Sequence, residues 1–488
     1  MSDSSFISNV VDERATPIPS PVICPWCGAE AQTLGRNCQI CGKLISELPE
    51  WAITGEEPSH ALLSTVRLRR WRLTFVVVLV FVLGFVFWLS VPFIPDPVVL
   101  LFKKPTSDLT SVSLPGQWSS VAWDLGGTRN LEDFSRQPKG HILWSENLGK
   151  HTYGAPIVVD GIIYAGGDFK AVALEAETGE TIWEIPTPGR MNHSFAVSDN
   201  YLYMGLSDHR LLALDRRTGD TRWEFFAEFP ITSSPIVAGG MVFFGSSDRF
   251  VYSVDAATGN LIWKHRLNGN LRSSPAISGG YLYATDSDGN LNILNARTGQ
   301  TRFRFRTAAS VSDAPVVGNG LAYFPSGGRL FAVDAEARTV WGEFEFKKVW
   351  SQFYIWQFPG VPRPPSQRGE RWRFAPEKMA SRGIVASPAV APEALYYGDA
   401  NGYLYARGVT NKESLWQFRA DDSISSSPVI LGDRLYFGDQ DGFFYALDRF
   451  TGNLDWRLSL DAPIEVSPVF ARGRFYVRTA DGWLHAID

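Results

Sequence analysis

Four cysteines are the residues of this chain whose type and spacing most clearly suggest chemistry. They form two Cys-x-x-Cys pairs, Cys24 with Cys27 and Cys38 with Cys41, and a glycine follows each pair. Two such pairs can hold one tetrahedral Zn²⁺ with four thiolates, which leaves no open position for a substrate. Two disulfides, or a redox-active Cys-x-x-Cys, are the alternatives. The symmetry of the two pairs favours a structural zinc ribbon.

The rest of the sequence has no arrangement that predicts catalysis. We see no Gly-rich phosphate loop, Ser-His-Asp arrangement or His-Glu-x-x-His motif, and the seven histidines are scattered. The adjacent carboxylates Asp421 and Asp422 fall where a connecting loop is expected. The net charge is −5 and no basic stripe is evident, so we expect no nucleic acid partner.

An apolar segment separates the cysteines from the rest of the chain. Leu73–Pro95 contains no charged residue and is long enough to span a bilayer as a helix. A buried core helix is the alternative. Four arginines precede the segment and two lysines follow it, at Arg67, Arg69, Arg70, Arg72, Lys103 and Lys104. The heavier basic cluster stays in the cytoplasm, so the N-terminus is expected inside and the C-terminal part outside the cell membrane. Thiolates on the reducing side agree with this orientation.

The C-terminal part repeats itself about every 40 residues, which indicates a propeller, a solenoid or an array. Each copy reads as four short strands with Asp-Gly hairpins, an Asp-x-x-Thr-Gly turn and an aromatic residue in its last strand. These aromatics, expected to fill the wedges between neighbouring sheets, are Trp144, Trp183, Trp223, Trp263, Phe303, Trp341, Trp416 and Trp456.

The number and ends of the copies predict a closed ring. Eight sets of strands can be counted, and the last one stops at Asp488 without its aromatic strand. Residues 140–144 form an aromatic strand that has no preceding partner. We therefore expect an all-β fold, an eight-bladed β-propeller of four-stranded blades whose last blade is completed by the N-terminal strand, which leaves no long exposed edge.

The repeat Ala-Leu-Asp-x-x-Thr-Gly-x-x-x-Trp resembles the pyrroloquinoline-quinone (PQQ) repeat of quinoprotein-like β-propellers, over residues 117–488. Residues 118–129 resemble the lead-in that often precedes such propellers. The resemblance implies either a quinoprotein alcohol dehydrogenase or a non-enzymatic relative such as the lipoprotein scaffold of the outer-membrane protein assembly machine. Quinoprotein dehydrogenases carry adjacent disulfide-bonded cysteines beside the quinone, and this propeller region has no cysteine. We therefore do not expect PQQ, since fold does not imply function.

One interval between aromatic strands, from Trp341 to Trp416, is much longer than the others. It holds an insertion at about residues 347–382 that is rich in basic and aromatic residues. Such a segment can contact a membrane surface or an acidic partner. Alternatively it is a hairpin that lies over the ring with its aromatics buried, and Trp372 could be the true blade residue. The candidate contact residues are Trp350, Phe353, Tyr354, Trp356, Arg363 and Arg368.

These patterns divide the chain into six parts. We expect a disordered N-terminus at 1–22, the zinc ribbon at 23–46, a linker at 47–66, a transmembrane helix at 67–95, an extracytoplasmic linker and lead-in at 96–138, and the propeller at 139–488.

The function expected from this organisation is a membrane-anchored, non-catalytic scaffold in the cell envelope, with structural zinc and a protein or peptide partner held by the blade loops or the central funnel. The alternatives are a membrane-bound quinoprotein dehydrogenase that uses PQQ, and an envelope ligand sensor that signals through the zinc ribbon.

Overall fold

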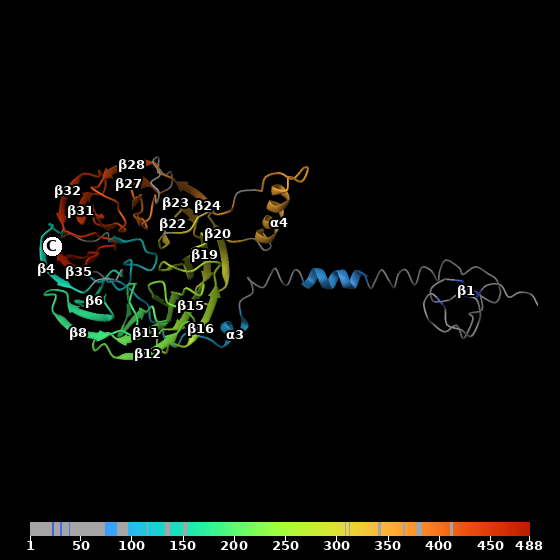
Figure 1. The fold of residues 1–488 in the computed structure, drawn as a ribbon, viewed down its shortest axis with the longest axis horizontal. Coiled ribbons are helices and arrows are strands. Elements are labelled where there is room, and N and C mark those ends of the chain that lie inside the picture. The colour runs from blue at the N-terminus through green and yellow to red at the C-terminus, as the bar shows by residue number, and fades with distance from the viewer. Residues whose placement is uncertain are drawn as a thin grey trace, which may run out of the picture. The chain divides into compact units, whose positions relative to one another are not determined.

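The computed structural model describes residues 22–23, 30–31, 39, 74–84, 96–114, 116–131, 137–149, 154–307, 309–311, 313–339, 343–364, 367–376, 383–409 and 413–488. The chain divides into two units, Met1–Trp88 and Leu89–Asp488. The second unit is a ring of eight antiparallel sheets (Figure 1). The predicted eight-bladed propeller of four-stranded blades is therefore confirmed.

Each blade contributes four strands, numbered here from the centre of the ring outward. Blade 1 consists of β5 (Ile157–Val159), β6 (Ile162–Gly167), β7 (Lys170–Glu175) and β8 (Thr181–Pro186). Blade 2 consists of β9 (Ala196–Ser198), β10 (Tyr201–Gly205), β11 (Arg210–Asp215) and β12 (Thr221–Phe226). Blade 3 consists of β13 (Ile236–Ala238), β14 (Met241–Gly245), β15 (Phe250–Asp255) and β16 (Leu261–Arg266). Blade 4 consists of β17 (Ala276–Ser278), β18 (Tyr281–Thr285), β19 (Asn290–Asn295) and β20 (Thr301–Arg306).

The second half of the ring follows the same plan. Blade 5 consists of β21 (Val316–Gly318), β22 (Leu321–Ser326), β23 (Arg329–Asp334) and β24 (Glu370–Phe374). Blade 6 consists of β25 (Ala389–Val390), β26 (Ala394–Gly398), β27 (Tyr403–Gly408) and β28 (Ser414–Arg419). Blade 7 consists of β29 (Val429–Leu431), β30 (Arg434–Gly438), β31 (Phe443–Asp448) and β32 (Leu454–Ser459). Blade 8 consists of β33 (Val469–Ala471), β34 (Arg474–Arg478), β35 (Trp483–Ile487) and β4 (Ile142–Asn147).

The N-terminal strand closes the ring as expected. In blade 8, β4 pairs antiparallel with β35, with Trp144 opposite Ala486 and Glu146 opposite Leu484. The backbone amides of Lys139 and Gly140 both donate to the carbonyl oxygen of Asp488 at 2.6 Å. The two ends of the propeller are thus joined by a complete strand ladder, so blade 8 has no missing edge strand.

An aromatic ring and a glycine lock most blades to the next. The Trp223 indole nitrogen in blade 2 donates to the carbonyl oxygen of Ala256 in blade 3 at 3.1 Å, and the Tyr203 hydroxyl donates to the same oxygen at 3.0 Å. Gly259 ends that Asp-x-x-Thr-Gly turn with φ +75°, and a Cβ there would lie 2.6 Å from Trp223 Cε3. Gly140 takes this place under Trp456 at the closure. The motif therefore serves contact between blades as well as turn geometry.

Blade 5 corrects one of the predicted aromatics. Its outer strand β24 pairs with β23 so that Trp372 lies opposite Ala332, and the Trp372 indole nitrogen donates to the carbonyl oxygen of Val409 in blade 6 at 3.1 Å. Trp372 therefore holds the position that we expected for Trp341, which lies outside the described residues. The insertion accordingly falls between β23 and β24, over residues 335–369, rather than at 347–382.

The N-terminal unit is described in three short pieces and one single residue. Strand β1 (Val22–Ile23) pairs antiparallel with β2 (Glu30–Ala31), so the hairpin brackets the first Cys-x-x-Cys pair. The four cysteines themselves lie outside the described residues. Residues 74–84 are helical with exposed side chains, and residues 85–95 are not described. No helix among the described residues is long and apolar enough to cross a membrane.

Candidate binding face and closed ring centre

The lead-in segment crosses the centre of the ring and bonds to the inner strand of one blade after another. Its last part, β3 (Asn130–Leu131), pairs parallel with β29 of blade 7. An inner strand has one unpaired edge, and each backbone bond to the lead-in covers part of such an edge. Seven backbone pairs join the lead-in to blades 1 to 7: Trp118–Val158, Ser119–Val197, Ser111–Val237, Leu125–Ile277, Gly126–Val317, Thr128–Val390 and Arg129–Ile430.

A small polar cavity lies under this segment. Its volume is about 170 Å³, and Asp124, Arg129, Asp313 and Glu465 contribute the charged side chains of its lining. Arg129 is only 3% exposed, and its Nη1 donates to the carbonyl oxygen of Gly127 at 3.1 Å. Burial lowers the pKa of Arg129, while the negative charges of Asp313 and Asp124 oppose that shift. Three carboxylates thus face one guanidinium, so the charged side chains of the lining carry a net negative charge.

Asp313 ties three blades together at this cavity. Its Oδ1 accepts a hydrogen bond from the backbone amide of Ala314 at 2.7 Å, and its Oδ2 accepts one from the amide of Ser387 at 2.8 Å. The Ser427 hydroxyl also donates to Oδ2 at 3.4 Å. A carboxylate whose oxygens are used in this way stabilises the junction of blades 5, 6 and 7, and we assign it a structural role.

The two faces of the ring differ. One face carries the turns between the first and second strands of each blade. The lead-in bonds to one of these turns, where Gly240 N donates to the Leu109 carbonyl oxygen at 2.8 Å, so we call this face the covered face. The open face carries the connections between blades and the turns between the second and third strands. A depression of about 550 Å³ on the open face is lined by Asp422, Ser423, Gln440 and Glu465 among others. It shares Glu465 with the inner cavity.

The adjacent carboxylates Asp421 and Asp422 lie in a loop, as expected, in the connection between β28 and β29. Asp421 Oδ2 accepts a hydrogen bond from the Tyr445 hydroxyl at 3.1 Å and forms an ion pair with Arg457. Asp422 is exposed. Asp421 is also exposed, but its carboxylate is held by these two side chains, so Asp422 is the better placed of the pair to meet a partner on the open face.

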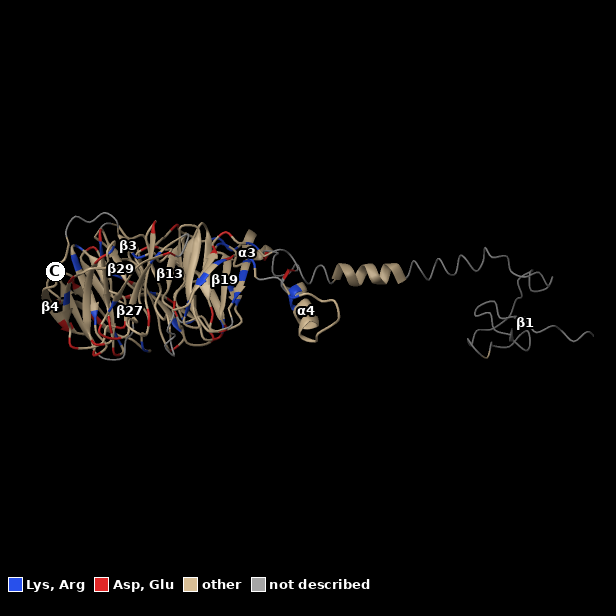
Figure 2. Cartoon of the chain, turned by 90° about the horizontal axis from the view of Figure 1, so that it is seen from above, with Lys and Arg blue, Asp and Glu red and all other residues tan. Residues whose placement is uncertain are grey.

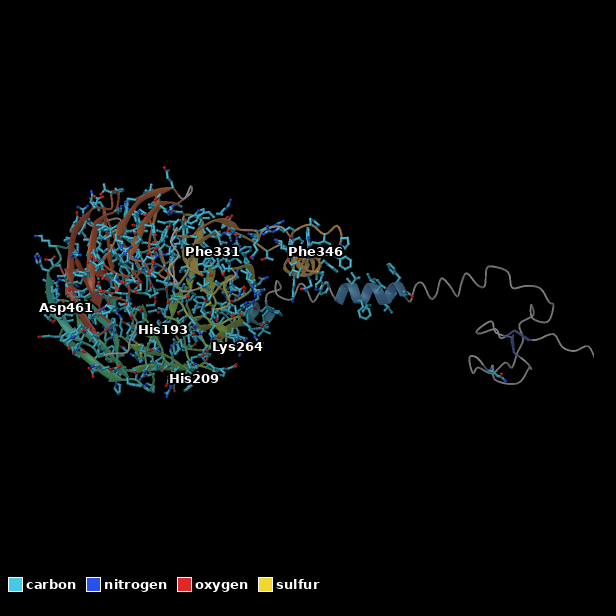
Figure 3. The ribbon with its side chains drawn as sticks, turned by 45° about the horizontal axis from the view of Figure 1, so that its top comes forward. His193, His209, Lys264, Phe331, Phe346 and Asp461 are labelled. Carbon is cyan, nitrogen blue, oxygen red and sulfur yellow. The ribbon has the colours of Figure 1, made fainter. Side chains whose placement is uncertain are left out.

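The insertion forms a helix, α4 (Glu343–Ile355), so our expectation of a hairpin over the ring with buried aromatics is wrong. Figure 2 shows α4 standing off the rim of the ring, and Figure 3 shows Phe346 on this helix and Phe331 inside blade 5. Trp356 is 63% exposed and Phe353 is 39% exposed. These aromatic side chains are exposed because the other, polar side of the helix faces the ring.

The remaining predicted contact residues lie on or next to α4. The Trp350 indole nitrogen donates to the carbonyl oxygen of Pro362 at 2.9 Å, which folds the following loop back along the helix. Tyr354 is 43% exposed. Arg363 and Arg368 line a groove of about 830 Å³ between α4 and blade 4. The structure thus brings all six predicted contact residues into one region.

Within the described residues, no group of three or more His, Cys, Asp or Glu side chains could hold a metal ion. Sequence reasoning missed the role of the lead-in at the ring centre, and it missed Asp313 as the residue that joins three blades. A single carboxylate before an Ala-Pro strand start was the only signal for Asp313.

Comparison with known proteins places this geometry in a family. The profile of the family described as outer membrane protein assembly factor BamB matches residues 131–249, 227–345 and 400–488, which is more than half of the chain. The chain belongs to this PQQ-repeat family. A comparison with curated protein sequences gives no match.

Solved structures share the fold of this family member. BamB from Moraxella catarrhalis aligns with a TM-score of 0.55 at 17% identity, over 71% of this chain and 96% of that one. Quinohemoprotein alcohol dehydrogenase from Comamonas testosteroni aligns with a TM-score of 0.60 at 15% identity, over 81% and 82%. The computationally designed protein Ika8 aligns with a TM-score of 0.56 at 13% identity, over 70% and 99%. An assembly factor, an enzyme and a designed protein match almost equally well, so the likeness shows the fold alone.

Proposed function

We propose that this chain is a membrane-anchored, extracytoplasmic scaffold that binds a protein or peptide without catalysis. The observation that carries the proposal is the lead-in segment, which fills one side of the ring centre by bonding to seven blades. The blade loops of the open face remain available to a partner. Membership of the family supports a binding role, because the matching family profile is named after an outer membrane protein assembly factor.

The inner cavity does not fit the quinone of the alternative function. Pockets that bind drug-sized ligands have volumes of ~300–1,000 Å³ and are lined mostly by apolar and aromatic side chains. This cavity measures about 170 Å³, and Ser, Asp, Glu and Arg side chains form much of its lining.

The expected partner site is the depression around Asp422, Gln440 and Glu465. Two of these three side chains are carboxylates, and Asp422 is exposed, so the depression suits a basic or amide-bearing segment of a partner. The central funnel that we expected as a second binding place corresponds to the region where this depression and the small inner cavity share Glu465.

The membrane anchor and the zinc ribbon complete the proposal. The helical residues 74–84 expose apolar side chains on every side, including Phe75 at 67% and Phe81 at 75%, and such a helix is stable in lipid rather than in water. The hairpin of β1 and β2 around the first Cys-x-x-Cys pair suits a zinc knuckle. If the ribbon lies inside the cell, the alternative sensor function would pass a signal from ligand binding outside the cell to a cytoplasmic partner of the ribbon.

Photo-crosslinking in cells tests the partner site. A photoreactive amino acid replaces Asp422 on the open face of the full chain, and the control replaces Phe450, which is 57% exposed in the turn between β31 and β32 on the covered face. We expect a discrete protein adduct from position 422 and none from position 450. Adducts from both positions in equal amounts, or from neither, contradict the proposed face.

Cysteine labelling in intact cells tests the orientation. The reporter is a single cysteine at position 20 or at position 300 in a chain whose own four cysteines are replaced by serine. An impermeant reagent should label Gln300→Cys and leave Ser20→Cys unlabelled. Labelling of position 20 alone would reverse the orientation.

A further inference from the structure

Helix α4 is amphipathic, and its polar side, not its apolar side, faces the ring. Successive residues of an α-helix are ~100° apart, so Phe346, Val349, Trp350, Phe353 and Trp356 form one stripe about a third of the circumference wide. On a surface helix of a globular protein such a stripe faces the core. Here Phe346 is 65% exposed and Val349 is 54% exposed. The apolar stripe therefore points away from the propeller.

The polar side of α4 explains this orientation. Glu343, Lys347 and Ser351, one helical turn apart, line the groove between α4 and blade 4. Glu343 forms an ion pair with Lys347 at 2.8 Å. The groove is strongly basic: against Glu343 it collects Arg304, Arg306, Lys347, Lys348, Arg363 and Arg368. Aromatic side chains would not pack favourably in this polar, charged groove, so the stripe faces away from it.

The root of α4 is fixed to blade 4. The backbone amide of Thr339 donates to the carbonyl oxygen of Arg302 at 3.0 Å. On the far side of the insertion, the Gln367 side chain forms two hydrogen bonds of 2.8 Å with the backbone of Arg306. Both anchoring residues belong to β20, so the stripe is held at the rim of blade 4.

A second apolar projection lies on the same blade. In α3 (Pro97–Leu101), Val99 is buried in a cluster with Ile277 and Leu282 of blade 4. Leu101 is 62% exposed and Phe102 is 78% exposed. Figure 1 shows α3 and α4 on the same side of the ring, next to β16 and β20.

The chain itself brings this rim to the bilayer if the proposed anchor spans it. The apolar segment ends at Pro95 and α3 begins at Pro97. Two residues of extended chain span at most ~7 Å, so α3 lies at the membrane surface on that side. Blade 4 then faces the bilayer, and α4 is attached to its outer strand.

We propose that α4 inserts its aromatic stripe into the interface of an anionic bilayer and, together with α3, holds the propeller edge-on at the membrane. This inference rests on the proposed membrane anchor. Interfacial helices bury an apolar face with aromatic residues and keep a basic face toward water and headgroups. The basic groove attracts anionic lipid within the Debye length of ~8–10 Å. The open face of the ring stays clear of the membrane and free for a partner.

Lipid quenching of a site-specific fluorophore tests the inference on the full chain. A fluorescent amino acid replaces Phe353, at the middle of the stripe, or Phe450, which is also exposed but lies on blade 7, across the ring. The protein is reconstituted into vesicles of 70% phosphatidylcholine and 30% phosphatidylglycerol, with or without bromine on the acyl chains. We expect brominated lipid to lower the emission at position 353 at least twofold and to leave position 450 unchanged.

Extraction with alkaline carbonate distinguishes a failure of the α4 contact from a failure of the proposed membrane anchor. If the chain stays in the membrane pellet and position 353 is not quenched, the docking of α4 is refuted and the anchor stands. If carbonate releases the chain, the anchor itself fails. A photoreactive group at position 353 that captures a protein in cells, in a chain whose vesicle-bound form is not quenched, would assign the stripe to a protein partner and refute the lipid contact.

Discussion

Gly259 offers the sharpest test of how the blades are joined. It ends a turn of blade 3 with φ +75°, and a Cβ added there would lie 2.6 Å from Cε3 and 2.8 Å from Cδ2 of Trp223 in blade 2. Gly280 has nearly the same conformation, with φ +78°, but a Cβ there would meet nothing within 4 Å. The variants Gly259→Ala and Gly280→Ala therefore share the backbone cost and differ in the contact between blades.

The size of the difference follows from these distances. A left-handed alanine costs ~1–2 kcal/mol, partly offset by ~0.4–1 kcal/mol because alanine restricts the unfolded chain. That term is common to both variants. Carbon atoms pack at ~3.5–4.0 Å, so in Gly259→Ala the indole must move by about 1 Å, and overpacking of this kind costs ~1–3 kcal/mol. With an unfolding entropy of ~2.1 cal/mol/K per residue, a propeller of this length should show a Tm about 1–4 °C lower for Gly259→Ala than for Gly280→Ala.

The assay is thermal unfolding of the full chain in detergent, followed by tryptophan fluorescence. A double variant, Gly259→Ala with Trp223→Leu, removes the ring that the new methyl group meets, so the added cost of Gly259→Ala should shrink toward that of Gly280→Ala. Equal losses for the two single alanine variants would refute the idea that Thr-Gly is needed for contact between blades.

Three further predictions concern protons, zinc and quinone. Burial, and secondarily the charge of Arg304, lowers the pKa of His265 to about 4, below its usual 6.5. The unfolded chain therefore takes up this proton first, so the stabilising contribution is present above pH 6.5 and is lost as the pH falls toward 4; His265→Gln should flatten that part of a Tm-against-pH curve, and an unchanged curve would contradict this. Elemental analysis of the purified full chain should give one zinc per chain, and Cys24→Ser with Cys38→Ser should abolish it without changing the Tm of the propeller; retained zinc would place the metal elsewhere. PQQ with calcium should leave the absorbance of the quinone and the Tm of the protein unchanged, whereas a shift in either would revive the dehydrogenase alternative.

The repeat allowed most of the ring to be predicted, because each blade repeats one contact. The spacing that places Gly299 under Trp263 recurs through the chain, and the unpaired strand at residues 140–144 reveals the closure. Trp341 misled us because its distance from Phe303 fits the repeat. A glycine three or four residues before the aromatic was the better signal: Arg338 and Ala337 hold those positions before Trp341, whereas Gly369 stands three residues before Trp372 and underlies Phe303.

The ring centre and the insertion were harder to predict for different physical reasons. The lead-in reaches seven blades through one or a few residues each, as Thr128 touches Val390, so no periodicity records its path. Helix α4 did carry a helical spacing of apolar residues. We interpreted the segment as either a contact loop or a hairpin with buried aromatics, and a stripe that faces away from the ring cannot be told from a buried one by spacing alone.

Disulfide trapping between β4 and β35 tests the closed ring most directly. Ser145 and His485 are partners in this ladder, and antiparallel partners have Cα atoms ~4.5–5.5 Å apart, within the range of a disulfide. In a chain whose native cysteines are serine, Ser145→Cys with His485→Cys should oxidise to an intramolecular crosslink that raises the Tm. Failure to crosslink, or a covalent dimer formed by strand exchange between two chains, would contradict a propeller sealed by its own N-terminal strand.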